Sequence, residues 1–215
     1  MSEHVASESQ LADPALFTRA SAVDSADIVI AERPLLGHVN LRGDPHDGRF
    51  IAAVERATGI ALPLAPNTVA EGHDTTICWL GPDEWLLVMP RNRVAEIASA
   101  LCTALDGAFA AVTEISGGQT VIVLRGRAAR DVLARGCPLD LHPRTFAPGR
   151  CAQSRLAKAP ILLRQVDMEP AFEIVVRRSF ADYLWSWLTE AAADAADVTS
   201  RAGDRERGTG DIGRG

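Results

Sequence analysis

The 215-residue sequence predicts an α+β protein built from two ferredoxin-like (plait) subdomains. Apolar residues in the first half recur with the periods expected for strand, helix, two strands, helix and strand, and the second half partly repeats this order. The chain is 47% apolar and 23% charged, which is enough apolar material for a sizeable core. The expected organisation is a flexible N-terminal tail over 1–26, a first subdomain over 27–105, a second over 106–197 and a disordered C-terminal tail over 198–215.

The first half is interpreted from local spacing and turn residues. Phe50 and Val54 fall at helical spacing, and Gly59 follows where a helix should end. The Gly-Pro-Asp-Glu run at 81–84 separates two segments rich in β-formers, which predicts a hairpin. The expected elements are strands at 28–31 and 39–41, a helix at 50–57, hairpin strands at 75–80 and 85–89, a helix at 94–105 and a strand at 110–115.

The second half is interpreted in the same way. Gly126 is expected to open a helix and Gly136 to close it, while Ser179 and Asp182 form a possible capping box for a last helix. A proline-rich connector over 137–150 lies between these helices. The expected elements are a strand at 120–125, a helix at 126–136, hairpin strands at 151–156 and 161–166, a strand at 172–178 and a helix over 180–188 with Phe180, Leu184, Trp187 and Leu188 on its apolar face.

Charge and composition exclude several classes of protein. The net charge is −6, and the basic residues, 21 arginines and Lys158, form no concentrated basic segment, so nucleic acid is not an expected partner. No apolar run approaches the roughly 20 residues of a membrane-spanning helix, and no secretory leader is recognisable, so no membrane association is expected. The four cysteines show no CxxC pairing, which fits a reducing compartment. We therefore expect a cytoplasmic protein.

Catalytic motifs are missing from the sequence. It contains no HExxH, no GxSxG, no GxGxxG and no Gly-Lys-Ser/Thr phosphate loop. Weaker signals are interpreted first as turns or solvated loops. They are Gly-Gly-Gln at 117–119, His38 with His46 and Asp47, His73 with Asp74, and Asp83 with Glu84.

Two tryptophans lie close together in the last predicted helix. Trp187 is assigned to its apolar face, and Trp185 then points roughly 200° away. Trp185 is therefore expected either to be exposed and to face a partner or to pack against the other subdomain.

Three blocks of the sequence carry a resemblance to a known family. They are WLGPDEWLLVMP at 79–90, the run from Glu114 to Val166 that includes GCPLDLHP and PGRCAQ, and FEIVVRRSFADYLWSWL at 172–188. Together they closely resemble the gamma subunit of heterotetrameric sarcosine oxidase. The N-terminal 75 residues contribute little to this resemblance.

The resemblance implies an oxidoreductase complex in which this chain is a non-catalytic subunit. Such a complex oxidatively demethylates sarcosine to glycine, forms H₂O₂ and passes the one-carbon unit to tetrahydrofolate as 5,10-methylenetetrahydrofolate. The implied partners are the alpha, beta and delta subunits. FAD, covalently attached FMN and NAD are implied on the two larger subunits and zinc on the smallest, so this chain is expected to have no catalytic, cofactor-binding or metal site of its own.

The same resemblance implies a fold similar to the folate-binding domains of the glycine-cleavage aminomethyltransferase. Those relatives bind folate through a carboxylate near a glycine-rich stretch, whereas here QVDMEPA precedes the strand that holds Glu173. We expect Glu173 to be a structural or interface carboxylate. An independent folate-binding protein remains the alternative. The expected interface anchors, chosen because aromatic and arginine side chains are common at interfaces, are Trp185, Arg177, Arg178, Arg144 and Arg150.

Overall fold

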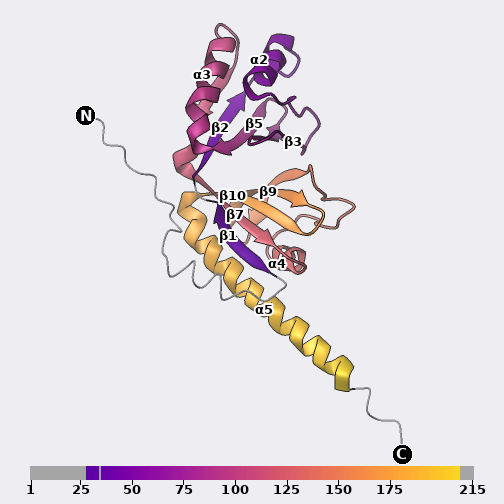
Figure 1. Cartoon of the computed structure of the whole chain (residues 1–215). Helices are drawn as coiled ribbons and strands as arrows, with labels where there is room; N and C mark the ends of the chain where they lie inside the picture. Colours follow the sequence, from indigo (N-terminus) through magenta and orange to yellow (C-terminus); the bar gives the residue numbers. More distant parts are fainter. Residues whose placement is uncertain (1–27, 34, 209–215) are drawn as a thin grey trace, which may run out of the picture.

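The structure, a computed structural model, describes residues 28–33 and 35–208, with side chains described up to residue 195. In this part of the chain, ten strands form two antiparallel sheets of five strands each (Figure 1). The first sheet contains, in spatial order, β3 (Val69–Glu71), β4 (Thr76–Gly81), β5 (Glu84–Pro90), β2 (Leu36–Arg42) and β6 (Ala111–Glu114). The second contains β1 (Val29–Arg33), β7 (Gln119–Arg125), β10 (Ala171–Arg177), β9 (Ala159–Asp167) and β8 (Cys151–Leu156).

Helices cover the outer face of each sheet, so the molecule has four layers in the order α/β/β/α (Figure 1). The helices α2 (Gly48–Thr58) and α3 (Val94–Ala104) pack on the first sheet. The helices α4 (Ala129–Ala134) and α5 (Ala181–Gly208) pack on the second. Short 3₁₀ turns, η1 (Arg91–Arg93), η2 (Ser116–Gly118) and η3 (Arg178–Phe180), lead into α3, β7 and α5.

The first unit confirms the predicted plait. Its elements follow the order β2, α2, β4, β5, α3 and β6, and the four strands lie side by side as β6-β2-β5-β4. The Asp47 carboxylate accepts a hydrogen bond from the backbone N–H of Arg49 and so caps α2. Gly59 ends this helix in the left-handed region with φ of 71°, as its position in the sequence predicts. The edge strand β3 is an addition that the apolar pattern does not indicate.

The second unit repeats this arrangement with one strand taken from elsewhere in the chain. Its order β1-β7-β10-β9-β8 matches β6-β2-β5-β4-β3 position for position. The strand β6 follows the second helix of its unit, whereas β1, which takes the equivalent place, comes from before the first unit. The side chains of Ile28 and Ile30 pack in the core beneath the second sheet, and this burial holds β1 there.

Strand pairing therefore differs from the predicted division near residue 106. Residues 29–33 fall within the range 27–105 but pair with β7, and β6 falls within 106–197 but pairs with β2. The reason is that pairing is decided by long-range burial, which the local spacing of apolar residues does not reveal. The existence of two separately folding subdomains stays a prediction.

The ends of the chain also differ from the expectation. The helix α5 ends at Gly208, so the predicted C-terminal tail at 198–215 is helical in its first part, and 209–215 lies outside the described residues. The predicted tail at 1–26 also lies outside them. Ser179 sits inside η3, and α5 begins only at Ala181, so the predicted capping box is replaced by a 3₁₀ turn. None of the described helices combines the length and the apolar character needed to cross a bilayer.

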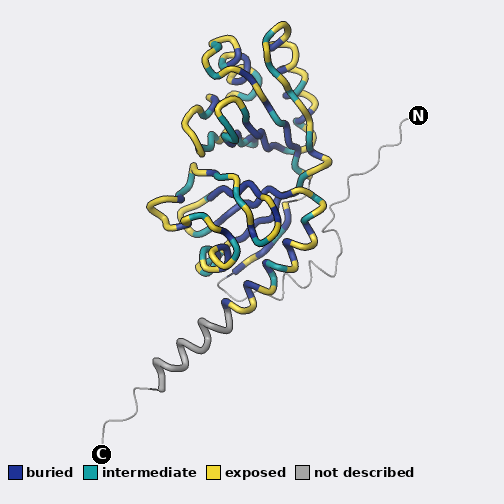
Figure 2. The backbone as a smooth tube through the Cα atoms, turned by 180° about the vertical axis from the view of Figure 1, so that it is seen from behind, coloured by how far each residue is buried: buried dark blue, intermediate teal, exposed yellow. Residues whose placement is uncertain are grey.

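Three clusters of buried apolar side chains fill the spaces between the four layers. Two lie between a sheet and its helices, and the third lies between the two sheets. Figure 2 shows the consequence: the strands at the centre of the molecule are mostly buried, while the outer sides of the helices and the loops are exposed. We call the space between the sheets the inter-sheet layer; its buried apolar members are Cys78, Leu86, Val88, Val121, Cys151, Leu162 and Val175.

Candidate subunit interface and the buried polar groups

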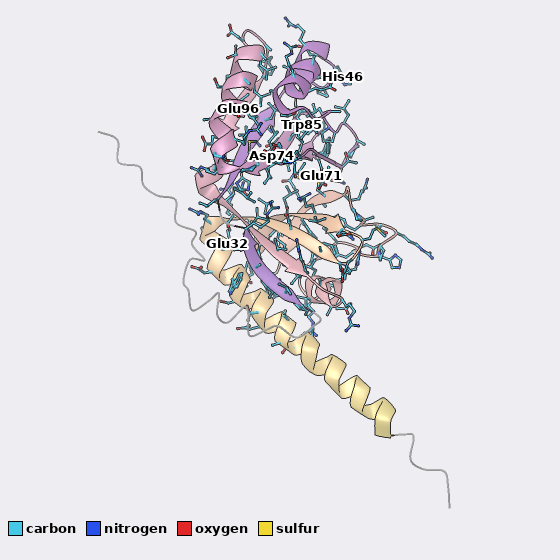
Figure 3. All side chains as sticks on the ribbon, in the orientation of Figure 1. Glu32, His46, Glu71, Asp74, Trp85 and Glu96 are labelled. Atoms are coloured by element: carbon cyan, nitrogen blue, oxygen red, sulfur yellow. The ribbon has the colours of Figure 1, made fainter. Side chains whose placement is uncertain are left out.

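A chain of ion pairs crosses the inter-sheet layer. Arg164 on β9 donates from Nε to Oε2 of Glu173 on β10 at 2.7 Å, and both side chains are buried. Arg164 also pairs with Glu71 of β3, which belongs to the other sheet, and Arg33 of β1 pairs with the second oxygen of Glu173. Figure 3 shows Glu71 at the boundary between the two units. The four charges sum to zero. They connect β3 of the first sheet with β9, β10 and β1 of the second.

The ion pairs determine how Glu173 ionises. Burial by itself would raise the pKa of Glu173, but the Arg164 and Arg33 guanidinium groups outweigh it and hold this pKa below its usual value. Burial would lower the pKa of Arg164, but Glu173 outweighs it and raises that pKa. Both oxygens of Glu173 are engaged by arginine, so its carboxylate is not available to a ligand. The contacts agree with the expected structural role of this residue.

Two cysteine thiols, one from each sheet, meet in the inter-sheet layer. The Sγ atom of Cys151 lies 3.4 Å from the carbonyl oxygen of Thr68 and 3.5 Å from that of Trp79, next to Cys78. The hydrogen bond between the two thiols raises the pKa of Cys78, with burial adding to the rise, and lowers the pKa of Cys151. All four cysteines are free thiols, and Cys102 is exposed.

His38 is a fully buried histidine on the central strand β2. Among the described residues neither of its ring nitrogens has a hydrogen-bond partner, although its backbone N–H donates to Oγ of Ser116 at 3.0 Å. Burial, with the charges of Arg91 and Arg178 adding to it, lowers the pKa of His38 to about 4. An adjoining cavity of about 10 Å³ has room for one water at most. His38 is therefore a neutral core residue at pH 7 and does not meet His46, as one weak sequence signal would require.

Three acidic residues from the other weak sequence signals have structural partners. Asp47 caps α2, Asp74 pairs with Arg93 at 2.7 Å, and Glu84 pairs with Arg42 at 3.0 Å. Gly117 and Gly118 form η2, and Gln119 begins β7. In the described part of the chain, no group of three or more His, Cys, Asp and Glu side chains has an arrangement that could hold a metal ion.

The five predicted interface anchors differ in how far the structure exposes them. Trp185 is 3% exposed and packs in the core between the second sheet and α5, so of its two expected positions the exposed one is not found. Arg178 is half-buried, and its Nε has no partner among the described residues. Arg177, Arg144 and Arg150 are exposed: the first ends β10, and the other two lie in the connector before β8.

The sequence assigned Trp187, rather than Trp185, to the apolar face of the last helix. Ala181, Leu184, Trp185 and Leu188 follow the i, i+3, i+4, i+7 pattern and are buried, and Ala191, Ala192 and Ala195 continue the buried stripe. Trp187 is half-buried beside that stripe and lies against Gly136, where an added Cβ would stand 2.6 Å from the tryptophan ring.

Exposed apolar side chains form a surface signal that the sequence did not indicate. Phe109 has its full side chain in solvent, beside a hollow of about 480 Å³ that is also lined by Pro45 and Ala110. Met168 is 72% exposed and lies in the turn between β9 and β10. Large exposed apolar residues often mark contacts with other proteins.

Comparison with known proteins identifies the family. The profile of the sarcosine oxidase gamma subunit family matches residues 42–194, well over half of the chain. The chain belongs to the sarcosine oxidase gamma subunit family. The gamma subunit of Corynebacterium sp. (strain P-1) is 37% identical over 159 residues, covering 74% of this chain and 76% of that protein. The gamma subunit of an Arthrobacter species is 34% identical over 173 residues, covering 80% and 83%.

Solved structures agree with the gamma-subunit assignment. A chain of the heterotetrameric sarcosine oxidase from Corynebacterium sp. U-96, in complex with pyrrole 2-carboxylate, matches with a TM-score of 0.74 and 33% identity, covering 83% of this chain and 93% of that one. The glycine cleavage system aminomethyltransferase T from Bartonella henselae matches with a TM-score of 0.57 and 14% identity, covering 80% of this chain and 48% of that one. This second match shows a shared fold, which confirms the predicted fold class.

Proposed function

We propose that this chain is the gamma subunit of a heterotetrameric sarcosine oxidase and that it acts by binding the larger subunits. The observation that carries the proposal is the likeness to a chain of the Corynebacterium enzyme, which covers 93% of that chain at 33% identity. The assembled complex would demethylate sarcosine oxidatively to glycine, with formation of H₂O₂ and 5,10-methylenetetrahydrofolate. Its partners would be the alpha, beta and delta subunits, in the cytoplasm.

The contacts of the buried polar groups support a role without catalysis in this chain. Glu173 is held by two arginines, and His38 is neutral and enclosed in the core. We infer that FAD, FMN, NAD, tetrahydrofolate and zinc are bound by the other subunits. The exposed Arg177, Arg144 and Arg150 remain the proposed polar anchors of the interface, and Phe109 joins them as an apolar one.

Co-expression tests this proposal. The chain, carrying a purification tag, is produced with and without the alpha, beta and delta subunits, and the purified material is analysed by size-exclusion chromatography and mass spectrometry. We expect a complex of four different subunits with sarcosine-dependent H₂O₂ production. A stable monomer that never co-purifies with the other three would refute the proposal.

A folate titration tests the alternative, an independent folate-binding protein. If the isolated chain binds tetrahydrofolate with micromolar affinity in calorimetry, then an independent folate-binding protein becomes the better description. The engagement of both Glu173 oxygens by arginine leads us to expect no binding in that range.

A further inference from the structure

Residues of both sheets line a groove of about 370 Å³. It lies at the end of β10, where Val175 and Arg177 line it two and four residues beyond Glu173. Its floor consists of Leu86, Leu162 and Val175, which also belong to the apolar cluster of the inter-sheet layer. We call this hollow the inter-sheet groove. Its volume lies in the range of sites that accept small ligands or short peptide side chains.

The rim of the inter-sheet groove is polar, and its acidic member is already neutralised. Glu84 accepts hydrogen bonds from Nδ2 of Asn40 at 2.8 Å and from Nη2 of Arg42 at 3.0 Å. The side-chain amide of Gln153 donates to the carbonyl oxygen of Leu80 at 2.8 Å and closes one wall. The groove therefore presents no free carboxylate from its described lining residues.

Two arginines lie in one cross-strand row of the second sheet, and one of them, Arg177, lines the groove. Arg155 lies opposite Pro160 in the β8–β9 pairing, and Arg177 lies opposite Gln119 in the β10–β7 pairing. Pro160, Arg177 and Gln119 line the groove, and Arg155 shares the face of β8 that carries Gln153. With strands about 4.8 Å apart, the Cα atoms of the two arginines are about 10 Å from each other.

Neither arginine has an acidic partner among the described residues. Arg155 donates from Nη2 to the carbonyl oxygen of Lys158 at 3.3 Å, which leaves its other donors free, and Arg177 is exposed. The whole chain carries a net charge of −6, so this row is a local excess of positive charge on an acidic protein. Such a local excess of positive charge attracts a carboxylate ligand at this point.

We propose that the inter-sheet groove binds an acidic segment of a partner subunit, with an apolar side chain on the groove floor and two carboxylates on Arg155 and Arg177. In an extended segment, residues two positions apart are about 7 Å from each other on the same face, within reach of both guanidinium groups. The inference rests on the proposed function, because the segment comes from another subunit of the oxidase.

The test compares two double variants in the co-expressed complex. Arg155→Gln with Arg177→Gln removes the two charges and keeps polar side chains of similar reach. The matched control is Arg49→Gln with Arg56→Gln, which removes two exposed charges from α2 on the far side of the first sheet. We expect the groove variant to lose at least tenfold in affinity for the other subunits, and the control to stay within twofold of the wild type. The thermal midpoints of both variants verify that they fold.

A photocrosslinker identifies the occupant of the groove. Gln153→benzoylphenylalanine places the probe at the mouth, and the crosslinked peptide is sequenced by mass spectrometry. We expect a partner peptide with two acidic residues within a few positions. Affinity equal to that of the control, a crosslinked peptide without acidic residues, or no crosslink together with saturable binding of citrate as a free polycarboxylate would each overturn the inference. Failure of the wild-type chain to co-purify would instead overturn the proposed function.

Discussion

At the scale of single residues, the most informative groups are the buried polar ones. Glu173 and Arg164 are an ion pair inside the inter-sheet layer, and Arg33 and Glu71 extend it to two further strands. The removal of one member of such a pair leaves an uncompensated buried charge, which costs more than the intact pair contributes. Stability should therefore respond sharply to substitutions here.

We expect Glu173→Gln to lower the free energy of unfolding by about 3 kcal/mol at pH 7, because Arg164 loses its closest buried counter-charge. Urea unfolding followed by circular dichroism measures the change. The control is Glu55→Gln on the exposed face of α2, for which a change within about 0.5 kcal/mol is expected. Equal effects of the two substitutions would mean that the ion pairs across the inter-sheet layer contribute little.

His38 gives the protein a specific pH dependence. Its pKa is lowered to about 4 in the folded state, so below pH 6.5 the unfolded chain takes up a proton that the folded chain does not. The free energy of unfolding should then fall by up to about 1.4 kcal/mol for each pH unit between pH 6.5 and pH 4, about 3 kcal/mol in all.

The substitution His38→Leu should remove this fall while leaving the stability at pH 8 equal or higher, because the unpartnered ring nitrogens are lost. Urea unfolding from pH 8 to pH 5.5 measures it, because carboxylates begin to titrate below that range. An unchanged pH profile in the variant would assign the loss to other groups.

At the scale of secondary-structure elements, the sequence predicted what local spacing determines. The helix ended by Gly59 and the hairpin turn at 81–84 were predicted because the turn residues and the apolar period act within a few positions. The sheet to which β1 belongs could not be predicted, because its partner β7 lies about ninety residues later. The face of α5 was misjudged because two overlapping apolar stripes compete, and only packing against the second sheet selects the one with Trp185.

The pairing of β1 with the second sheet leads to a test with adjacent residues. Ile30 is 4% exposed and packs under the second sheet, whereas Val29 is 47% exposed on the other face of the same strand. We expect Ile30→Ala to cost about 2–5 kcal/mol and Val29→Ala less than about 0.5 kcal/mol, as measured by urea unfolding. Similar losses in both variants would contradict the placement of this strand.

At the scale of the whole molecule, burial on both faces of each sheet organises the fold. The runs Leu86–Met89 and Val121–Leu124 are buried throughout, without the alternation of a sheet that has one face in water. Such uninterrupted apolar strands do indicate a sheet covered on both sides. They do not reveal that the inner face of each sheet is covered by the other sheet. For this reason neither the ion pairs of Glu173 nor the inter-sheet groove could be derived from the spacing of apolar residues. Phe109 was also missed, because exposure of a single aromatic residue has no periodic signal.

The packing of the layers predicts the reactivity of the four thiols. Cys78, Cys137 and Cys151 are buried, and Cys102 on α3 is exposed. We expect a maleimide reagent to modify one thiol per native chain and four in 8 M urea, with Cys102→Ser removing the native reaction. Intact-mass spectrometry counts the adducts. Comparable labelling of Cys78 or Cys151 under native conditions, located by peptide mapping, would show that the sheets separate readily.

The position of β1 also affects how the protein forms during synthesis. The strand leaves the ribosome before the whole first unit, yet the strand that pairs with it, β7, is made only after that unit is complete. Domains that emerge early usually fold early. Here β1 must wait, with apolar residues such as Ile30 uncovered, until β7 has been made. The second sheet can therefore be completed only after the second unit has been translated, and not when the first helices and strands appear.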